Sequence, residues 1–180
     1  MAGVICQPIS FIGLPGSGKS TVGRQLARRL QVPFFDSDHV IEERLGCSIR
    51  VAFERDGEQP FRDLEESVLD ELTQVPHAVV STGGGAVLRS ATRQRLNERG
   101  YVVYLNSSPD EISRRLKHDA SRPLLQVDDP LKRLRELYAV RDPLYRETAH
   151  FVIETGRPSV ATLVNMIVMQ LELAGAHPLN

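Results

Sequence analysis

The sequence predicts an α/β fold: a three-layer, doubly wound domain built on a central five-stranded parallel sheet. Two observations lead to this prediction. Five short runs are continuously apolar, as parallel strands buried on both faces are, and segments with helical periodicity alternate with them. The five expected strands cover residues 9–13, 32–36, 77–82, 101–106 and 150–155.

Periodicity, caps and prolines mark the helices between these strands. The first helix carries Val22, Leu26 and Leu30 at fourfold spacing, so they form one apolar stripe that can lie on the sheet. Later helices open at a proline or a capping side chain: Pro60, Ser90, Ser108-Pro109 and Asp129-Pro130. We expect Pro143 to disturb the last of these. A strongly apolar terminal helix over 159–173 should cover one face of the sheet.

Composition favours one domain, residues 1–180, with a small-molecule partner. A chain of 180 residues suits a single domain. With 22 Lys+Arg against 23 Asp+Glu, no basic field exists to hold nucleic acid. Cys6 and Cys47 lie in no metal-binding or disulfide pattern, so we interpret them as ordinary buried or half-buried thiols. No secretory leader or membrane-spanning segment is visible, which predicts a cytoplasmic protein without a membrane partner.

The segment "GLPGSGKST", residues 13–21, has the spacing of a phosphate loop. Its glycines permit backbone angles and close approaches that a Cβ would prevent, Lys19 reaches the β- and γ-phosphates, and Ser20 offers a hydroxyl to Mg²⁺. A helix beginning near Lys19 adds its positive end. The alternative is a glycine-rich turn that matches by chance. We assign nucleotide binding to Gly16, Ser17, Gly18, Lys19, Ser20 and Thr21.

Two carboxylates follow the second expected strand, in "FFDSDH". Asp36 and Asp38 occupy alternate positions near the carboxyl edge of the sheet, where open α/β folds bind ligands, and strand alternation would send both side chains the same way. One could hold a metal-bound water while the other accepts a hydroxyl proton or hydrogen bond from the phosphoryl acceptor. The alternative is that one of them caps the helix that follows.

Two further features admit a functional and a structural explanation. Arg62 and Glu65 stand one helical turn apart, and taken alone they suggest an exposed intrahelical ion pair. The consecutive Gly83, Gly84 and Gly85 carry an entropic cost directly after a buried strand. They make sense if a ligand must touch the backbone there, although a wide turn would also explain them. The irregular segment 122–129 lies where a mobile lid could be.

The set of motifs resembles that of the shikimate kinase family. "GLPGSGKST", "DSD", "FRDLE", "TGGG", "SRPLL" and "RDPLYRE" occur in that family's order and at its spacings, over residues 9–157. The resemblance implies the fold of the nucleoside monophosphate kinases. It also implies transfer of the γ-phosphoryl group of ATP, with Mg²⁺, to the 3-hydroxyl of shikimate, giving shikimate 3-phosphate on the way to chorismate and the aromatic amino acids.

The resemblance also implies roles for individual residues on the acceptor side. Asp38 would bind the shikimate hydroxyls and act as the catalytic base, while Asp36 would support Mg²⁺ through water. Arg62 and Arg141 would bind the substrate carboxylate, a task that suits the planar guanidinium fork. The backbone of the triple glycine would contact the substrate, and Glu65 would orient Arg62 from behind.

On the nucleotide side, the resemblance implies that Arg122 folds over the phosphates and stabilises charge during transfer. Arg115 and Arg157 would contact adenine. We place the lid at about 115–130 and the acceptor-binding region at about 38–70, and we expect a monomer.

Two other functions remain open at this point. The nearest is a different small-molecule kinase of the same architecture, such as a gluconate kinase, whose acceptor is also a polyhydroxylated acid. The two arginines, the triple glycine and "RDPLYRE" favour shikimate. The second is a non-catalytic nucleotide-binding switch. A GTPase of that kind would carry an Asn-Lys-x-Asp guanine motif, and the sequence has none.

Overall fold

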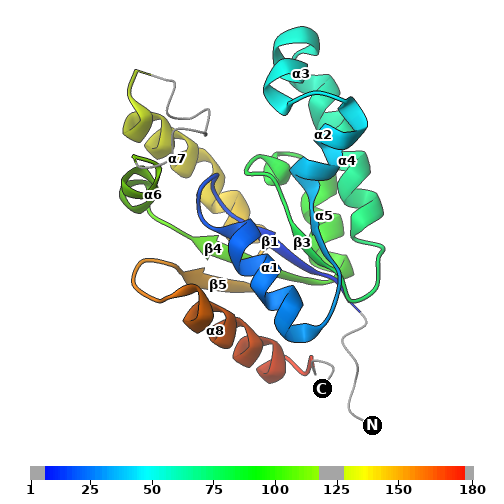
Figure 1. Ribbon diagram of the computed structural model, residues 1–180, viewed down its shortest axis with the longest axis vertical. Helices are drawn as coiled ribbons and strands as arrows, with labels where there is room; N and C mark the ends of the chain where they lie inside the picture. Colours follow the sequence, from blue (N-terminus) through cyan, green and yellow to red (C-terminus); the bar gives the residue numbers. More distant parts are fainter. Residues whose placement is uncertain (1–6, 118–127, 177–180) are drawn as a thin grey trace.

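Five parallel strands form one sheet, as the sequence predicts (Figure 1). The computed structural model describes residues 7–117 and 128–176. The strands are β1 (Ile9–Ile12), β2 (Phe34–Asp36), β3 (Val79–Ser81), β4 (Tyr101–Asn106) and β5 (Phe151–Glu154). Their order across the sheet is β2-β3-β1-β4-β5 and every pairing is parallel. Both the fold class and all five expected strands are therefore confirmed.

Helices cover both faces of this sheet (Figure 1). They are α1 (Lys19–Leu30), α2 (Ser37–Leu45), α3 (Ile49–Asp56), α4 (Glu58–Leu72), α5 (Ser90–Arg99), α6 (Pro109–Leu116), α7 (Pro130–Thr148) and α8 (Val160–Leu173), with a 3₁₀ turn η1 (Ala86–Leu88). Helices α1 and α8 pack on one face, and α5, α6 and α7 pack on the other. The doubly wound arrangement follows.

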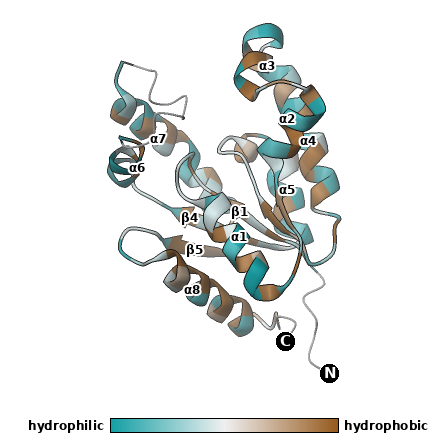
Figure 2. Cartoon of the chain, in the orientation of Figure 1, coloured by the Kyte–Doolittle hydropathy of each residue, from teal (hydrophilic) through white to brown (hydrophobic). Residues whose placement is uncertain are grey.

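Alternation along the strands builds two cores from one sheet. Phe11 packs with α1 and α8, whereas the next residue, Ile12, packs with the helices of the opposite face. The hydropathy colouring agrees, because the strands and α8 carry much of the brown ribbon (Figure 2). A third apolar cluster packs α2 and α4 against β3 of the same sheet. That cluster anchors the part of the chain that carries Asp38 and Arg62. In the described residues, the helices are all too short or too polar to span a membrane.

The helices differ from the expectation at two places. The expected disturbance at Pro143 is wrong, since α7 continues through it to Thr148. Proline removes one helical hydrogen bond, but Tyr145 and Thr148 beyond it are buried and hold the last turns against the core. The short helix α3 was not anticipated from the pattern. Ser48 caps it by accepting a hydrogen bond from Val51 N (3.2 Å), a local signal that was available in the sequence.

Candidate active site

The predicted functional residues gather where the parallel strands end. The phosphate loop follows β1, Asp36 is the last residue of β2, and the triple glycine follows β3. These three strands are neighbours in the sheet, so their carboxyl ends meet at one edge, as ligand sites of open α/β folds do. Figure 1 shows α2, α3 and α4 on one side of this edge and α6, with the β5–α8 loop, on the other.

The phosphate loop has the backbone that the motif requires. Gly16 and Gly18 have φ values of 84° and 94°, in the left-handed region that favours glycine. At Gly13 a Cβ would lie 2.7 Å from the carbonyl oxygen of Leu105, so only glycine fits between the loop and β4. Helix α1 begins at Lys19 and has no acidic residue in its first turn. Its free N–H groups and positive end can therefore bind phosphate.

Lys19 and Ser20 are placed for the two tasks that the sequence assigns to them. The Lys19 ammonium is buried and donates hydrogen bonds to the carbonyl oxygens of Gly13 (2.8 Å) and Leu14 (2.9 Å), which hold it across the loop. The Ser20 hydroxyl donates to Asp36 Oδ2 at 2.6 Å. Because that donation uses the hydroxyl proton, the Ser20 oxygen can accept from the Ser81 hydroxyl (3.1 Å), and a second lone pair remains available to a cation.

Asp36 serves as a cap and keeps one oxygen for the site. Its Oδ1 accepts hydrogen bonds from the backbone N–H groups of Asp38 (3.0 Å) and His39 (3.4 Å), and so caps α2. Its Oδ2 faces Ser20. Two hard oxygen donors fit Mg²⁺, which keeps several waters and binds substrate phosphates. In residues 7–117 and 128–176, no cluster of three or more acidic, histidine or cysteine side chains offers a fuller cage.

Asp38 reaches the site by a different route from the one expected. The prediction that it alternates with Asp36 along a strand is wrong, because β2 ends at Asp36 and Asp38 lies in the first turn of α2. The cap itself causes this, since it turns the chain into a helix. Even so, both carboxylates line one hollow with Lys19. Burial, and then the negative charge of Asp36, raise the pKa of Asp38 to about 6.

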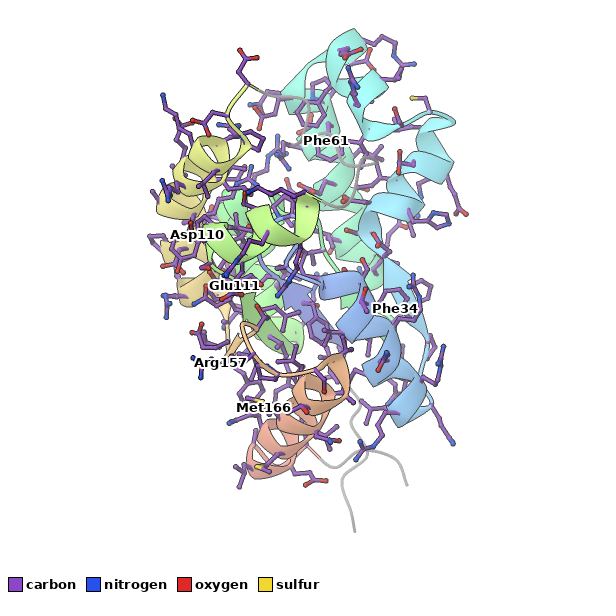
Figure 3. All side chains as sticks on the ribbon, turned by 60° about the vertical axis from the view of Figure 1, so that its left-hand side comes forward. Phe34, Phe61, Asp110, Glu111, Arg157 and Met166 are labelled. Carbon is purple, nitrogen blue, oxygen red and sulfur yellow. The ribbon has the colours of Figure 1, made fainter. Side chains whose placement is uncertain are left out.

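Arg62 and Glu65 form a buried ion pair, so the simpler explanation of an exposed pair is wrong. Their nitrogen and oxygen are 2.8 Å apart, and the side chains are only 10% and 5% exposed. Glu58 accepts a further hydrogen bond from Arg62 Nε (3.3 Å). The guanidinium also lies near the rings of Phe53 and Phe61; Figure 3 labels Phe61 on α4. Burial raises the pKa of Glu65, although Arg62 opposes the shift.

The triple glycine makes room for the charged side chains of the site. A Cβ on Gly83 would lie 2.7 Å from Asp38 Oδ1 and 3.0 Å from Glu65 Oε2, and one on Gly85 would lie 2.5 Å from the Arg62 guanidinium. A Cβ on Gly84 would overlap Pro15 of the phosphate loop. A wide turn alone does not explain three glycines at these contacts. At each of the three positions, the space that a Cβ would take is next to a group of the site or of the phosphate loop.

Arg141 approaches the same region from α7. Burial lowers the pKa of its guanidinium, and the nearby positive charge of Arg62 acts in the same direction. Its guanidinium interacts with Tyr145, one helical turn further along α7, and the Tyr145 hydroxyl donates to the carbonyl oxygen of Gly84. The structure therefore brings Arg62 and Arg141 together although 79 positions separate them in the chain. Sequence analysis missed Tyr145, and its place in "RDPLYRE" beside Arg141 was the available signal.

The nucleotide side is a hollow of about 470 Å³ next to the phosphate loop. Arg115 lines it and donates to the carbonyl oxygen of Gly16 (3.3 Å) and to Thr155 Oγ1 (3.5 Å). Arg157 is exposed on the loop before α8 and does not line this hollow (Figure 3). Glu111, which the sequence analysis missed, contacts Thr155 at 3.3 Å. Arg122 and most of the expected lid lie outside the described residues.

Three hollows follow one another along this edge of the sheet. The nucleotide-side hollow shares Gly16, Gly18 and Thr21 with a middle hollow of about 160 Å³, which Lys19, Ser20, Asp36 and the glycine turn also line. The middle hollow shares Asp38 with an acceptor-side hollow of about 650 Å³ lined by residues of α2 and α3. A nucleotide and a second molecule can thus meet at Lys19 and Asp38.

Phosphate-binding backbone on one side of Asp38 and a pair of arginines on the other are typical of P-loop kinases that phosphorylate a small anionic molecule. A family model described as "Shikimate kinase" matches residues 15–172. The chain belongs to the shikimate kinase family. It is 65% identical to a shikimate kinase of Paracidovorax citrulli over 94% of each chain.

Solved structures agree with this assignment. The chain is similar to the shikimate kinase from Acinetobacter baumannii in complex with shikimate, with a TM-score of 0.87, 45% identity and 94% of each chain covered. The rival considered above is represented by a gluconokinase from Sinorhizobium meliloti, at a TM-score of 0.59 and 17% identity over 96% of this chain and 95% of that one. That likeness extends to the fold alone.

Proposed function

We propose that the three hollows divide the work of one reaction: transfer of the γ-phosphoryl group of ATP, with Mg²⁺, to the 3-hydroxyl of shikimate, which is the activity of the family to which the chain belongs. One observation carries the proposal. Lys19, Ser20, Asp36 and Asp38 line the middle hollow, between the nucleotide side and the acceptor side. Phosphoryl transfer needs its phosphate-binding, metal-binding and acceptor-binding groups at one such point.

The phosphate loop binds the triphosphate and holds it in place. Backbone N–H groups of residues 16–21 and the N-terminus of α1 surround the β-phosphate. Lys19 leaves its carbonyl partners in the loop for the β- and γ-phosphates, where its charge offsets the charge that develops in transfer. Mg²⁺, when bound, would supply positive charge that offsets the charge of the phosphates. Ser20 would hold it directly, and Asp36 Oδ2 would hold one of its waters.

Asp38 accepts the proton of the acceptor hydroxyl. As the hydroxyl oxygen forms its bond to the γ-phosphorus, the bond from that phosphorus to the bridging oxygen of ADP breaks, and the hydroxyl proton passes to an Asp38 oxygen. A base works best when its pKa is close to the working pH. The pKa of Asp38, about 6 because of burial, meets this condition better than that of an exposed aspartate.

Arg62 and Arg141 bind the carboxylate of the acceptor. Arg62 is already paired with Glu65 and Glu58, whereas in the described residues no ion pair involves Arg141. The charge that has no carboxylate partner in the described residues is therefore that of Arg141, and burial makes this positive charge costly without an anion. An anionic acceptor therefore gains more there than a neutral one, and Gly85 leaves room for the Arg62 guanidinium.

A coupled assay of ADP release, run with shikimate, shikimate methyl ester and gluconate side by side, tests this proposal. We expect turnover with shikimate, and kcat/KM for the ester lower by roughly 30-fold to several thousand-fold, since stranding a buried charge costs about 2–5 kcal/mol. Gluconate should react far more slowly than shikimate. Similar kcat/KM for acid and ester would rule out the carboxylate-binding role, and similar rates with gluconate would rule out the choice of acceptor.

Several finer expectations stay predictions from the sequence. They are the acceptor-binding region at about 38–70, the lid at about 115–130 with Arg122, the adenine contacts of Arg115 and Arg157, the monomeric state and the cytoplasmic location. The position of Arg115 beside the phosphate loop supports its assignment.

A further inference from the structure

The two arginines of the acceptor side are held in place by different kinds of partner. Arg62 is fixed by two carboxylates, at 2.8 Å from Glu65 and 3.3 Å from Glu58. Arg141 is half-buried, and its neighbour is the phenol of Tyr145, one helical turn further along α7, with which its guanidinium interacts. A guanidinium has five donors, no acceptor and a flexible stem, so an acceptor must orient it before it can bind a carboxylate through two parallel bonds.

The Tyr145 hydroxyl is suited to that task. It is fully buried and donates its proton to the carbonyl oxygen of Gly84. With the proton used in this way, its lone pairs can accept from Arg141. Burial raises the pKa of the phenol above its ordinary value, so the proton stays in place throughout the working pH range. One oxygen atom therefore joins α7 to the glycine turn.

The packing of the ring keeps that oxygen in place. The Tyr145 ring lies 4.9 Å from the ring of Tyr104, between centroids, within the core under α7. Gly84 in turn packs against Pro15 of the phosphate loop. The position of the hydroxyl is thus set by the core, and the position of the turn is set by the loop that binds phosphate.

We propose that Tyr145 is a positioning residue for acceptor recognition: its hydroxyl fixes the Arg141 guanidinium against the Gly84 carbonyl, in the orientation that binds the acceptor carboxylate. The inference rests on the proposed function, in which Arg141 binds that carboxylate. Tyr145 itself touches no reacting atom in this scheme. Its contribution is to acceptor affinity and is made entirely through Arg141.

A double-mutant cycle of Tyr145→Phe and Arg141→Ala tests the inference. Phenylalanine keeps the ring and removes one oxygen. We expect Tyr145→Phe to raise the KM for shikimate about tenfold, as loss of a hydrogen bond to a charged group does, while kcat and the KM for ATP change less than about threefold. In the double variant the KM should equal that of Arg141→Ala alone, because Tyr145 then has nothing to orient.

Tyr104→Phe is the matched control. It removes another buried tyrosine hydroxyl from the same ring pair, one that lies within hydrogen-bond distance of two acceptors, Asp142 Oδ1 (2.8 Å) and Asn106 Oδ1 (3.1 Å). Melting temperatures of both variants give the structural cost of each lost hydroxyl. We expect a lower melting temperature for Tyr104→Phe and a KM for shikimate within about twofold of wild type, since this hydroxyl contacts neither arginine.

The outcomes separate the inference from the proposed function. Three results would each overturn the positioning role: an unchanged KM for shikimate in Tyr145→Phe, additive effects in the double variant, or an equal rise in KM for Tyr104→Phe. The proposed function would still stand in these cases, provided that the enzyme turns over shikimate. If Arg141→Ala itself leaves the KM for shikimate unchanged, Arg141 does not bind the carboxylate. Its carboxylate-binding role and the inference about Tyr145 are then both overturned.

Discussion

The nucleotide side and the acceptor side of this site are built from different materials. The phosphate-binding part of the nucleotide side is one contiguous segment, residues 13–21, whose backbone N–H groups and glycine conformations are suited to bind phosphate. The acceptor side uses charged side chains that come from α2, α4 and α7. Backbone groups carry no net charge and stay solvated in the absence of ligand. Side chains such as Asp38 and Arg62 must be held, partly buried, by the fold.

That difference appears in the electrostatics. Burial is the first cause of the shifted pKa of Asp38, Glu65 and Arg141, and each shift favours the uncharged form. The protein thus keeps three groups on the acceptor side whose charge is costly. Perturbed groups of this kind mark sites where function outweighs stability. Mutations on the nucleotide side should therefore change mainly kcat. Mutations on the acceptor side should change kcat, the affinity for the acceptor and the stability of the fold together.

The largest effect should come from the nucleotide side. We expect Lys19→Ala to lower kcat by ~10³ or more, because a charge aimed at the transferring phosphoryl group is lost. Its effect on acceptor binding should be small. Calorimetry with shikimate in the absence of nucleotide should give a Kd within about threefold of wild type, since Lys19 contacts the phosphate loop. A parallel loss of shikimate affinity would contradict the division between the two sides.

Asp38 lies where the two sides meet and gives the next largest effect. We expect Asp38→Asn to lower kcat by at least ~10², the low end for a lost general base, and to weaken shikimate binding as well. A kcat within a few-fold of wild type would remove Asp38 from the role of base. In the wild type, kcat/KM should fall about tenfold per pH unit below pH 6, because the pKa of Asp38 is about 6.

The same variant should be more stable than wild type at neutral pH. The folded-state pKa of Asp38, about 6, lies above its ordinary value of 3.8, so folding favours the protonated form. The charged carboxylate therefore destabilises the fold above pH 6, and this penalty disappears as the pH falls toward 4. Thermal unfolding of the ligand-free protein should show a higher Tm for Asp38→Asn at pH 7.5 and a much smaller difference at pH 4.5.

The comparison also explains what could be predicted from the sequence. The nucleotide side is local, so the spacing of its glycines, Lys19 and Ser20 was enough to predict both the loop and the start of α1. The five strands were predicted for a similar reason, because continuous apolar runs report burial directly. Asp38 was assigned to the right hollow for the wrong reason, since the cap at Asp36 turns the chain within one residue.

The acceptor side is not local, and its burial could not be predicted. An Arg and a Glu three positions apart look the same whether the pair is exposed or buried. What buries Arg62 and Glu65 is the turn at Gly83 and Gly85, which comes about twenty residues later and leaves room for them. Likewise, α7 continues past Pro143 because Tyr145 beyond it is buried. Both features depend on contacts between distant segments.

The smallest of these effects tests the geometry of the acceptor side. We expect Arg62→Lys to lower kcat/KM for shikimate by about 30-fold, the low end for a broken buried charge pair. Lysine keeps the charge, but it offers no planar fork and cannot serve Glu65, Glu58 and an acceptor carboxylate together. The KM for ATP should stay within about twofold of wild type, because Arg62 lies on α4 and lines neither the nucleotide-side hollow nor the middle hollow.

Arg44→Lys provides the matched control for this change. Arg44 and Glu71 form an ion pair between α2 and α4, the helices that also carry Asp38 and Arg62. The side chains of this pair, however, are 42% and 54% exposed. Exposed pairs contribute about 0–1 kcal/mol, so this variant should leave the kinetics unchanged. If Arg62→Lys also leaves the kinetics unchanged, burial of the Arg62–Glu65 pair does not matter for recognition of the acceptor. The proposed dependence of the acceptor side on buried charged side chains is then wrong. Steady-state kinetics of both variants, measured with shikimate and ATP varied in turn, decides between these results.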